Sequence, residues 1–144
     1  MKKIIMMLCL MLSLATVFAV AEETGESPVE QAKALMASGD AEGAVAVLEE
    51  AAATGDAAAQ SALGDCYAFG MGVEQDGQKA MEYYALSAEQ GYPVAMFALG
   101  DCYYKGNGVE NDWEKAGEWC QKALDAGYEP DETDQVHMKE VFGE

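Results

Sequence analysis

Apolar and polar residues alternate along this chain with the spacing of amphipathic helices. In the stretch around residue 63 the apolar residues are Ala59, Ala62, Leu63, Cys66 and Tyr67, at steps of three and four that place them on one face of a helix. Glycines and acidic capping residues separate such stretches. We therefore expect an all-α protein. The predicted helix pairs cover residues 28–55, 56–91 and 92–127, and a last helix covers 131–142.

The predicted pairs are copies of one unit. Residues 62–67 read Ala-Leu-Gly-Asp-Cys-Tyr and recur, 36 positions later, as residues 98–103, and a Gly-x-Gly-Val-Glu turn follows each copy. A period of this length is typical of stacked supersecondary units. Each unit would be two antiparallel helices that bury an apolar face against the next pair, which makes an α-solenoid. Residues 28–55 keep part of the period and form a divergent first unit.

Two features of the sequence predict how the helices of this array pack. Gly64 and Gly100 lie in the middle of equivalent helices, where glycine costs about 1 kcal/mol relative to alanine. We infer that a partner helix approaches too closely there for a side chain. The last helix, residues 131–142, is expected to cap the array by covering an apolar face of the final repeat.

The amino terminus is predicted to be a secretory signal peptide over residues 1–21. Lys2 and Lys3 precede an apolar run, and Ala19-Val20-Ala21 offers a small-x-small cleavage site. A membrane anchor is the alternative, but the run is short for a bilayer and no basic cluster follows it. We expect cleavage after Ala21, a disordered leader over 22–27, no stable membrane insertion afterwards, and a periplasmic or secreted protein.

Charge narrows the classes of partner. The 144 residues include 26 acidic residues and eight lysines, with no arginine. Loss of residues 1–21 removes two lysines and leaves a net charge of about −20. Nucleic acids and anionic membranes need clustered Lys and Arg, so both are poor candidates. A basic partner or a neutral ligand fits this charge better.

Three cysteines lie after the signal peptide: Cys66, Cys102 and Cys120. Cys66 and Cys102 hold equivalent places in neighbouring repeats, farther apart than the roughly 7 Å that a disulfide spans between Cα atoms. Cys102 and Cys120 are expected at different heights on antiparallel helices. We therefore expect three free, buried thiols and no disulfide. Use of an odd thiol between molecules is the alternative.

The residues predict neither a catalytic centre nor a metal site. No serine is followed three residues later by lysine, so the Ser-x-x-Lys arrangement of penicillin-interacting enzymes is absent. His137 is the only histidine, and we expect it solvated on the last helix rather than paired with a cysteine or holding zinc. We expect no enzyme and no cofactor. The competing classes are an enzyme acting on cell-wall material or β-lactams, and an acidic buffer of calcium.

The repeat resembles a known family. Ala-x-x-Leu-Gly-x-x-Tyr, Gly-x-Gly-Val, Asp-x-x-Lys-Ala and a closing Gly-Tyr are similar to the Sel1-like repeat, a relative of the tetratricopeptide repeat. The resemblance covers residues 57–128 as two repeats, whereas 28–55 is closer to a tetratricopeptide unit. It implies an adaptor or scaffold, and bacterial members are often exported. A cysteine-rich branch linked to β-lactams and cell-wall peptides pairs cysteines within each repeat, which this chain does not.

The candidate binding surface is the concave face, which the first helix of each pair would line. Phe97 and Tyr104 are two helical turns apart and share a side, where aromatic residues can anchor a partner or merely fill packing gaps. Asp65 and Asp101 recur once per repeat and could hold a peptide backbone or a basic side chain. The expected partner is a protein or peptide, and two short arrays could also form a homodimer. By alignment with the family, the outward positions are Lys33, Met36, Asp65, Phe69, Phe97, Asp101, Tyr104 and Lys105.

Overall fold

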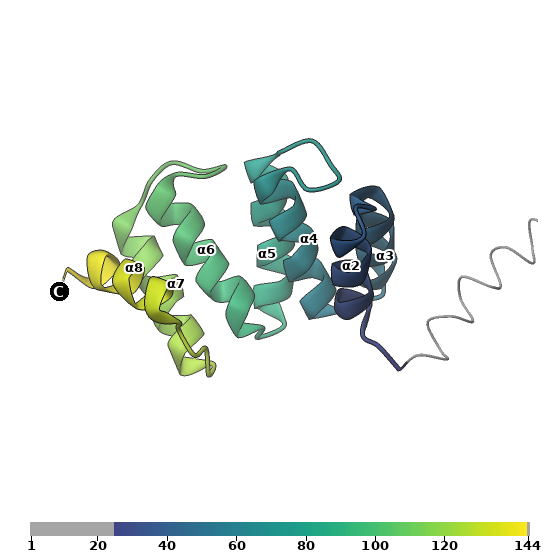
Figure 1. The fold of residues 1–144 in the computed structure, drawn as a ribbon. Helices are drawn as coiled ribbons and strands as arrows, with labels where there is room; N and C mark the ends of the chain where they lie inside the picture. The colour runs from purple at the N-terminus through teal and green to yellow at the C-terminus, as the bar shows by residue number, and fades with distance from the viewer. Residues whose placement is uncertain (1–24, 144) are drawn as a thin grey trace, which may run out of the picture.

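The structure is a computed structural model that describes residues 25–143 and shows only helices in that range. The proposed signal peptide and residues 22–24 of the leader lie outside the described residues, and residues 25–27 are exposed and without helix. In the labels of Figure 1, the helices are α2 Pro28–Ala37, α3 Ala41–Ala53, α4 Ala57–Phe69, α5 Gly77–Glu89, α6 Pro93–Lys105, α7 Trp113–Asp125 and α8 Glu132–Phe142.

Local chemistry sets where these helices begin and end. Aspartates cap most of the amino termini; Asp40 and Asp56, for example, accept hydrogen bonds from the backbone N–H groups three residues on, at 2.8 and 2.9 Å. Such caps satisfy amide groups that have no partner within the helix. At the carboxyl ends of α4 and α6, Gly70 and Gly106 adopt φ of 67° and 69°, a left-handed conformation that favours glycine. The long turns therefore start at the positions that the repeat predicts.

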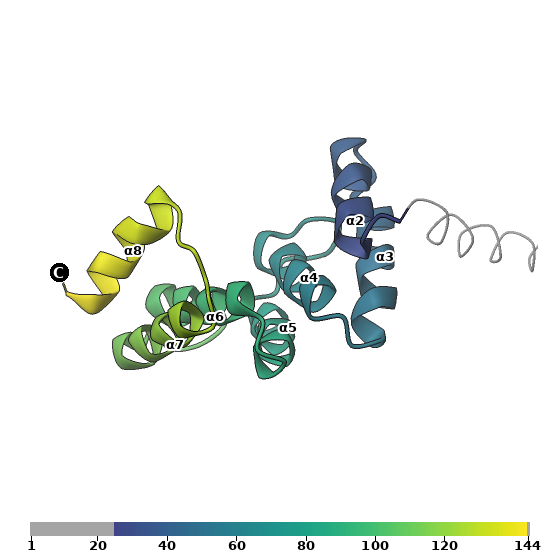
Figure 2. The same ribbon diagram turned by 90° about the horizontal axis from the view of Figure 1, so that it is seen from below.

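The helices stack as adjacent pairs in the predicted α-solenoid. The first helices α2, α4 and α6 form one row, and their partners α3, α5 and α7 lie behind them (Figure 1). Seen from below, α2 and α8 rise at the two ends of a floor made by α4 to α7 (Figure 2). The row of first helices therefore lines the concave side, and the sequence-based prediction of the fold is confirmed.

Small residues bring the paired helices close together. Ala44, Ala59, Ala80, Ala95 and Ala116 are fully buried at 0 % exposure. Larger side chains fill the rest of the core. The largest members of this core are Leu48, Leu63, Leu99, Tyr67 and Tyr84.

Gly64 and Gly100 mark close contacts between the two helices of a pair, as the sequence predicted. A Cβ on Gly64 would lie 2.6 Å from Cε1 of the buried Tyr84 ring. A Cβ on Gly100 would lie 2.7 Å from Sγ of Cys120 and 3.1 Å from the carbonyl oxygen of Ala116. Both distances are far shorter than carbon contacts allow, so each glycine is required by the helix packed against it.

Helix α8 occupies the place of the first helix of a further unit but packs less closely. At the 36-residue spacing, Met138 matches Cys102, and Met138 is the one buried residue of α8, whereas α6 buries four. Asp131 and Val136, at the positions that correspond to Ala95 and Gly100 of α6, are exposed, and α8 lies at an angle to the stack (Figure 2).

The cap therefore does more than cover the end of the last repeat. Its carboxyl end rests on α7, since a Cβ on Gly117 would lie 3.9 Å from side-chain atoms of Val141 and Phe142. Its middle part reaches over the concave side of α6, where Phe97, Tyr104 and His137 meet.

Gly100→Ala and Gly64→Ala should each destabilise the protein by up to about 2 kcal/mol, because a clash worth roughly 1–3 kcal/mol outweighs a gain in helix propensity of about 1 kcal/mol. Gly117→Ala is the matched control, since its Cβ would meet nothing closer than 3.9 Å; it should stabilise by up to about 1 kcal/mol. Urea denaturation followed by circular dichroism measures all three. Equal effects of the three changes would contradict the close contact.

Candidate functional site

Two neighbouring grooves run along the concave side. The first, which we call the α4–α6 groove, has a volume of about 240 Å³. The second, the α6–α8 groove, has a volume of about 650 Å³. Phe97, Asp101 and Lys105 of α6 line both. The α4–α6 groove is completed mainly by Asp65, Ala68, Phe69, Tyr84 and Val94, and the α6–α8 groove by Tyr104, Glu132, Thr133, Asp134, Val136, His137 and Glu140.

The grooves are equivalent positions in successive units. Asp65, Ala68 and Phe69 on α4 correspond, 36 residues on, to Asp101, Tyr104 and Lys105 on α6. On the opposite wall, Asp101 of the first groove corresponds to His137 of the second. The concave face therefore repeats one groove with different side chains in it.

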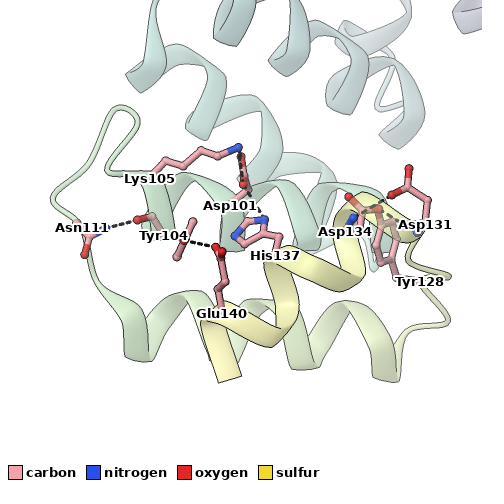
Figure 3. Close-up of polar contacts among 9 residues, drawn as sticks. All are labelled: Asp101, Tyr104, Lys105, Asn111, Tyr128, Asp131, Asp134, His137 and Glu140. Atoms are coloured by element: carbon pink, nitrogen blue, oxygen red, sulfur yellow. Dashed lines mark hydrogen bonds and ion pairs between the residues drawn. The ribbon is translucent and has the colours of Figure 1, made fainter. Parts of the chain in front are cut away.

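His137 occupies the α6–α8 groove (Figure 3). Its Nδ1 lies 3.0 Å from Oδ1 of Asp101, and its ring centroid lies 4.4 Å from that of Tyr104 and 5.7 Å from that of Phe97. The His137 side chain is only 13 % exposed. The expectation of a solvated histidine was wrong, because α8 turns this residue toward the aromatic pair of α6 instead of toward water.

Further polar contacts hold α8 over α6 and α7. The Tyr104 hydroxyl donates to Oε2 of Glu140 at 2.5 Å, and the Tyr128 hydroxyl donates to Oδ2 of Asp134 at 2.6 Å (Figure 3). Hydrogen bonding to Glu140 raises the pKa of Tyr104. The Phe97 ring stacks on Tyr128 at 4.7 Å between centroids. Phe97 and Tyr104 do share a side of the helix, and on that side they bind the chain's own last helix.

Within residues 25–143, no helix lies over the α4–α6 groove. Asp65 accepts a hydrogen bond from the Tyr84 hydroxyl at 2.7 Å, and its burial raises the pKa of this carboxyl group. Phe69 and Val94 stand at the edges of the groove with 72 % and 44 % of their surfaces exposed. Large apolar side chains that remain exposed beside a carboxylate are suited to contact with a partner.

The predicted site residues separate into two groups. Six of the eight line one or both grooves: Asp65, Phe69, Phe97, Asp101, Tyr104 and Lys105. Lys33 and Met36 lie on α2 and line neither; Lys33 pairs with Glu30 at 2.8 Å, and Met36 packs against the core. Sequence reasoning missed Val94 and His137. The repeat length could have indicated His137, since this residue follows Asp101 by one period.

The three thiols are buried, and Cys102 is among the residues that line the α4–α6 groove. Cys66, Cys102 and Cys120 are free and buried. Burial raises the pKa of Cys66 and of Cys120 to about 11, and that of Cys102 to about 12. They therefore stay protonated at neutral pH and are weak nucleophiles.

The described residues also bear on metal binding and on membrane insertion. Within residues 25–143, no three His, Cys, Asp or Glu side chains converge as ligands of a metal ion. None of the helices in that range is long and apolar enough to cross a membrane.

Comparison with known proteins agrees with the repeat. The model of the Sel1 repeat matches residues 57–92 and 93–128, half of the chain. The chain belongs to the Sel1 repeat family, whose members are generally protein-interaction modules. No curated protein gives a significant match.

Two solved structures show the likeness in three dimensions. A Sel1 repeat protein from Oxalobacter formigenes is 28 % identical, with a TM-score of 0.67 over 81 % of this chain and 45 % of the other. A protective antigen present in uropathogenic Escherichia coli strains, described as displaying an SLR fold, is 27 % identical, with a TM-score of 0.53 over 88 % of this chain and 28 % of the other. This chain spans less than half the length of either.

Asp65→Asn should change how stability depends on pH. Burial raises the pKa of the folded Asp65 carboxyl above its unfolded value of about 3.9, so the parent loses stability as pH rises from the unfolded to the folded pKa. The variant, which cannot ionise there, should gain on the parent over this interval and keep the gain at pH 7. Urea denaturation between pH 3.5 and 7 tests this, with exposed Glu89→Gln as the charge-matched control. A constant difference across the range would contradict it.

Proposed function

We propose that this protein is an exported, non-enzymatic adaptor that holds a segment of a partner protein on its concave face. The observation that carries the proposal is the series of two equivalent grooves lined by the first helices of successive repeats. Sel1 repeats generally serve protein interaction, and such arrays bind extended or helical segments along the inner surface.

Within the described residues, the α4–α6 groove is the part of the concave face that α8 leaves uncovered. Helix α8 lies over the other groove, where its side chains contact Phe97, Asp101 and Tyr104. Phe69 and Val94 remain largely uncovered at the edges of the first groove. A partner segment would therefore bury these two side chains, and Asp65 and Asp101, which line the groove, would favour a segment without acidic residues.

A non-enzymatic role is supported by the state of the reactive groups. The three thiols are buried with raised pKa values, and the His137 ring is engaged by Asp101 and two aromatic rings rather than by a nucleophile. Nucleophilic catalysis needs an activated group next to a base. The grooves instead offer shape, apolar area and fixed charge.

Export rests on the amino-terminal sequence. If residues 1–21 act as a signal peptide, the protein recovered from the cell envelope or the medium should begin at Glu22. Intact mass measurement and amino-terminal sequencing determine this. A blocked-cleavage variant, Ala19→Asp with Ala21→Asp, serves as the control and should retain the longer chain. Recovery of the uncleaved parent from the cytoplasm would contradict export.

Site-specific photo-crosslinking tests the binding face. A photoreactive phenylalanine analogue at position 69 or 94 should capture a partner in cells that express the chain, whereas the same analogue at position 86 should not. Leu86 is the matched control because it is 47 % exposed on α5, in the row behind the first helices.

The same partner should be lost when the groove is made polar. In an affinity pull-down, Phe69→Ser with Val94→Ser should lower recovery at least about tenfold, since burying two such side chains is worth roughly 1.5–3 kcal/mol each. Leu86→Ser should leave recovery unchanged, and all variants should keep the helical spectrum of the parent. Equal recovery with both variants would overturn the concave face as the binding surface.

A further inference from the structure

Asp65 and Asp101 hold equivalent places in the two grooves, but their carboxylates have different partners. In the α6–α8 groove, the Asp101 carboxylate has two nitrogen partners from this chain: Lys105 Nζ at 2.9 Å and His137 Nδ1 at 3.0 Å. One repeat earlier, the residues at those two positions are Phe69 and Asp101. The α4–α6 groove thus keeps the carboxylate and replaces both nitrogen-bearing side chains.

Asp65 is left with a neutral partner only. Its Oδ1 accepts the Tyr84 hydroxyl at 2.7 Å, and in the described part of the chain Oδ2 accepts no hydrogen bond and no lysine or histidine nitrogen lies within 4 Å. Lys105 lines the same groove, but its ammonium group is already bound by Asp101. The groove therefore holds two carboxylates and one ammonium group.

The apolar surface beside Asp65 has the form that a long basic side chain needs. Phe69 follows Asp65 by one helical turn on α4, lines the same groove, and is 72 % exposed. Lysine and arginine side chains pack their aliphatic stems along apolar surface and place the charge beyond it, and an aromatic face also attracts the cation. Val94, on the first turn of α6, supplies a second apolar edge.

We infer that the α4–α6 groove recognises a lysine or arginine side chain of the partner segment, with the charged group on Asp65 and the aliphatic stem against Phe69. This inference rests on the proposed function and assigns the chemistry of its partner. Two further observations agree with it: the raised pKa of Asp65 reflects burial that no positive charge offsets, and a mature net charge of about −20 draws basic partners.

A panel of synthetic peptides tests the inference on the full mature chain. The peptides are acetylated and amidated Ala-Gly-Leu-Xaa-Leu-Gly-Ala, with Xaa lysine, arginine, methionine or glutamate. Titrations followed by amide chemical shifts should show the lysine and arginine peptides binding at least about tenfold tighter than the methionine peptide, as expected for one hydrogen bond to a charged group. The glutamate peptide should bind weakest.

Four variants test whether the Asp65 carboxylate binds the positive charge of the peptide. Asp65→Asn should abolish the preference for lysine over methionine while leaving the methionine peptide unchanged, and Phe69→Ala should weaken lysine and methionine peptides alike. Glu89→Gln, an exposed site on α5 with the same loss of charge, should behave as the parent. Glu140→Gln, which removes a carboxylate of the α6–α8 groove only, should preserve the preference.

Several outcomes would overturn the inference. Equal affinity for all four peptides, or a lysine preference that survives Asp65→Asn and disappears with Glu140→Gln, would place the recognition elsewhere. Absence of binding by every peptide would also reject recognition of a basic side chain by this groove. The photo-crosslinking at positions 69 and 94 remains a separate test, so a captured partner without a charge preference would retain the proposed function and reject only this step.

Discussion

Close approach between the two helices of each pair is the constraint on which the rest of this structure depends. Gly64 and Gly100 have no room for a Cβ against Tyr84 and Cys120, and alanines are among the most deeply buried residues of the core. One helix pair has too little apolar surface to fold alone. Small residues at these points let neighbouring helices pack closely enough for the array to share one core. The row of first helices, and with it the concave face, follows from this spacing.

The last helix departs from the regular stack. Helix α8 lies at an angle that brings His137 onto Asp101 (Figure 3). This helix thus fills one groove of the concave face with a side chain of this protein. In the described part of the chain the neighbouring groove stays open, with a partly buried carboxylate and two exposed apolar side chains.

Much of the site could be predicted from the repeat, and the misses have physical causes. Asp65, Phe69 and Asp101 were placed on the concave face because the repeat fixes which side of each first helix points away from its partner. His137 was misjudged because its acidic surroundings in the sequence suggested exposure, whereas its exposure depends on the tilt of α8. Met36 was predicted to point outward, but α2 belongs to the divergent first unit and packs it against the core.

The sequence by itself determined the helices, their caps, the repeat length and the pairing of helices, since these depend on local hydrogen bonding and on a periodicity that can be counted. Only the tertiary structure decided which concave groove is filled and which is open. That outcome depends on the angle of one helix and on contacts between residues 36 positions apart, such as Asp101 with His137 and Tyr104 with Glu140. Side chains at equal places in the repeat therefore acquired different environments.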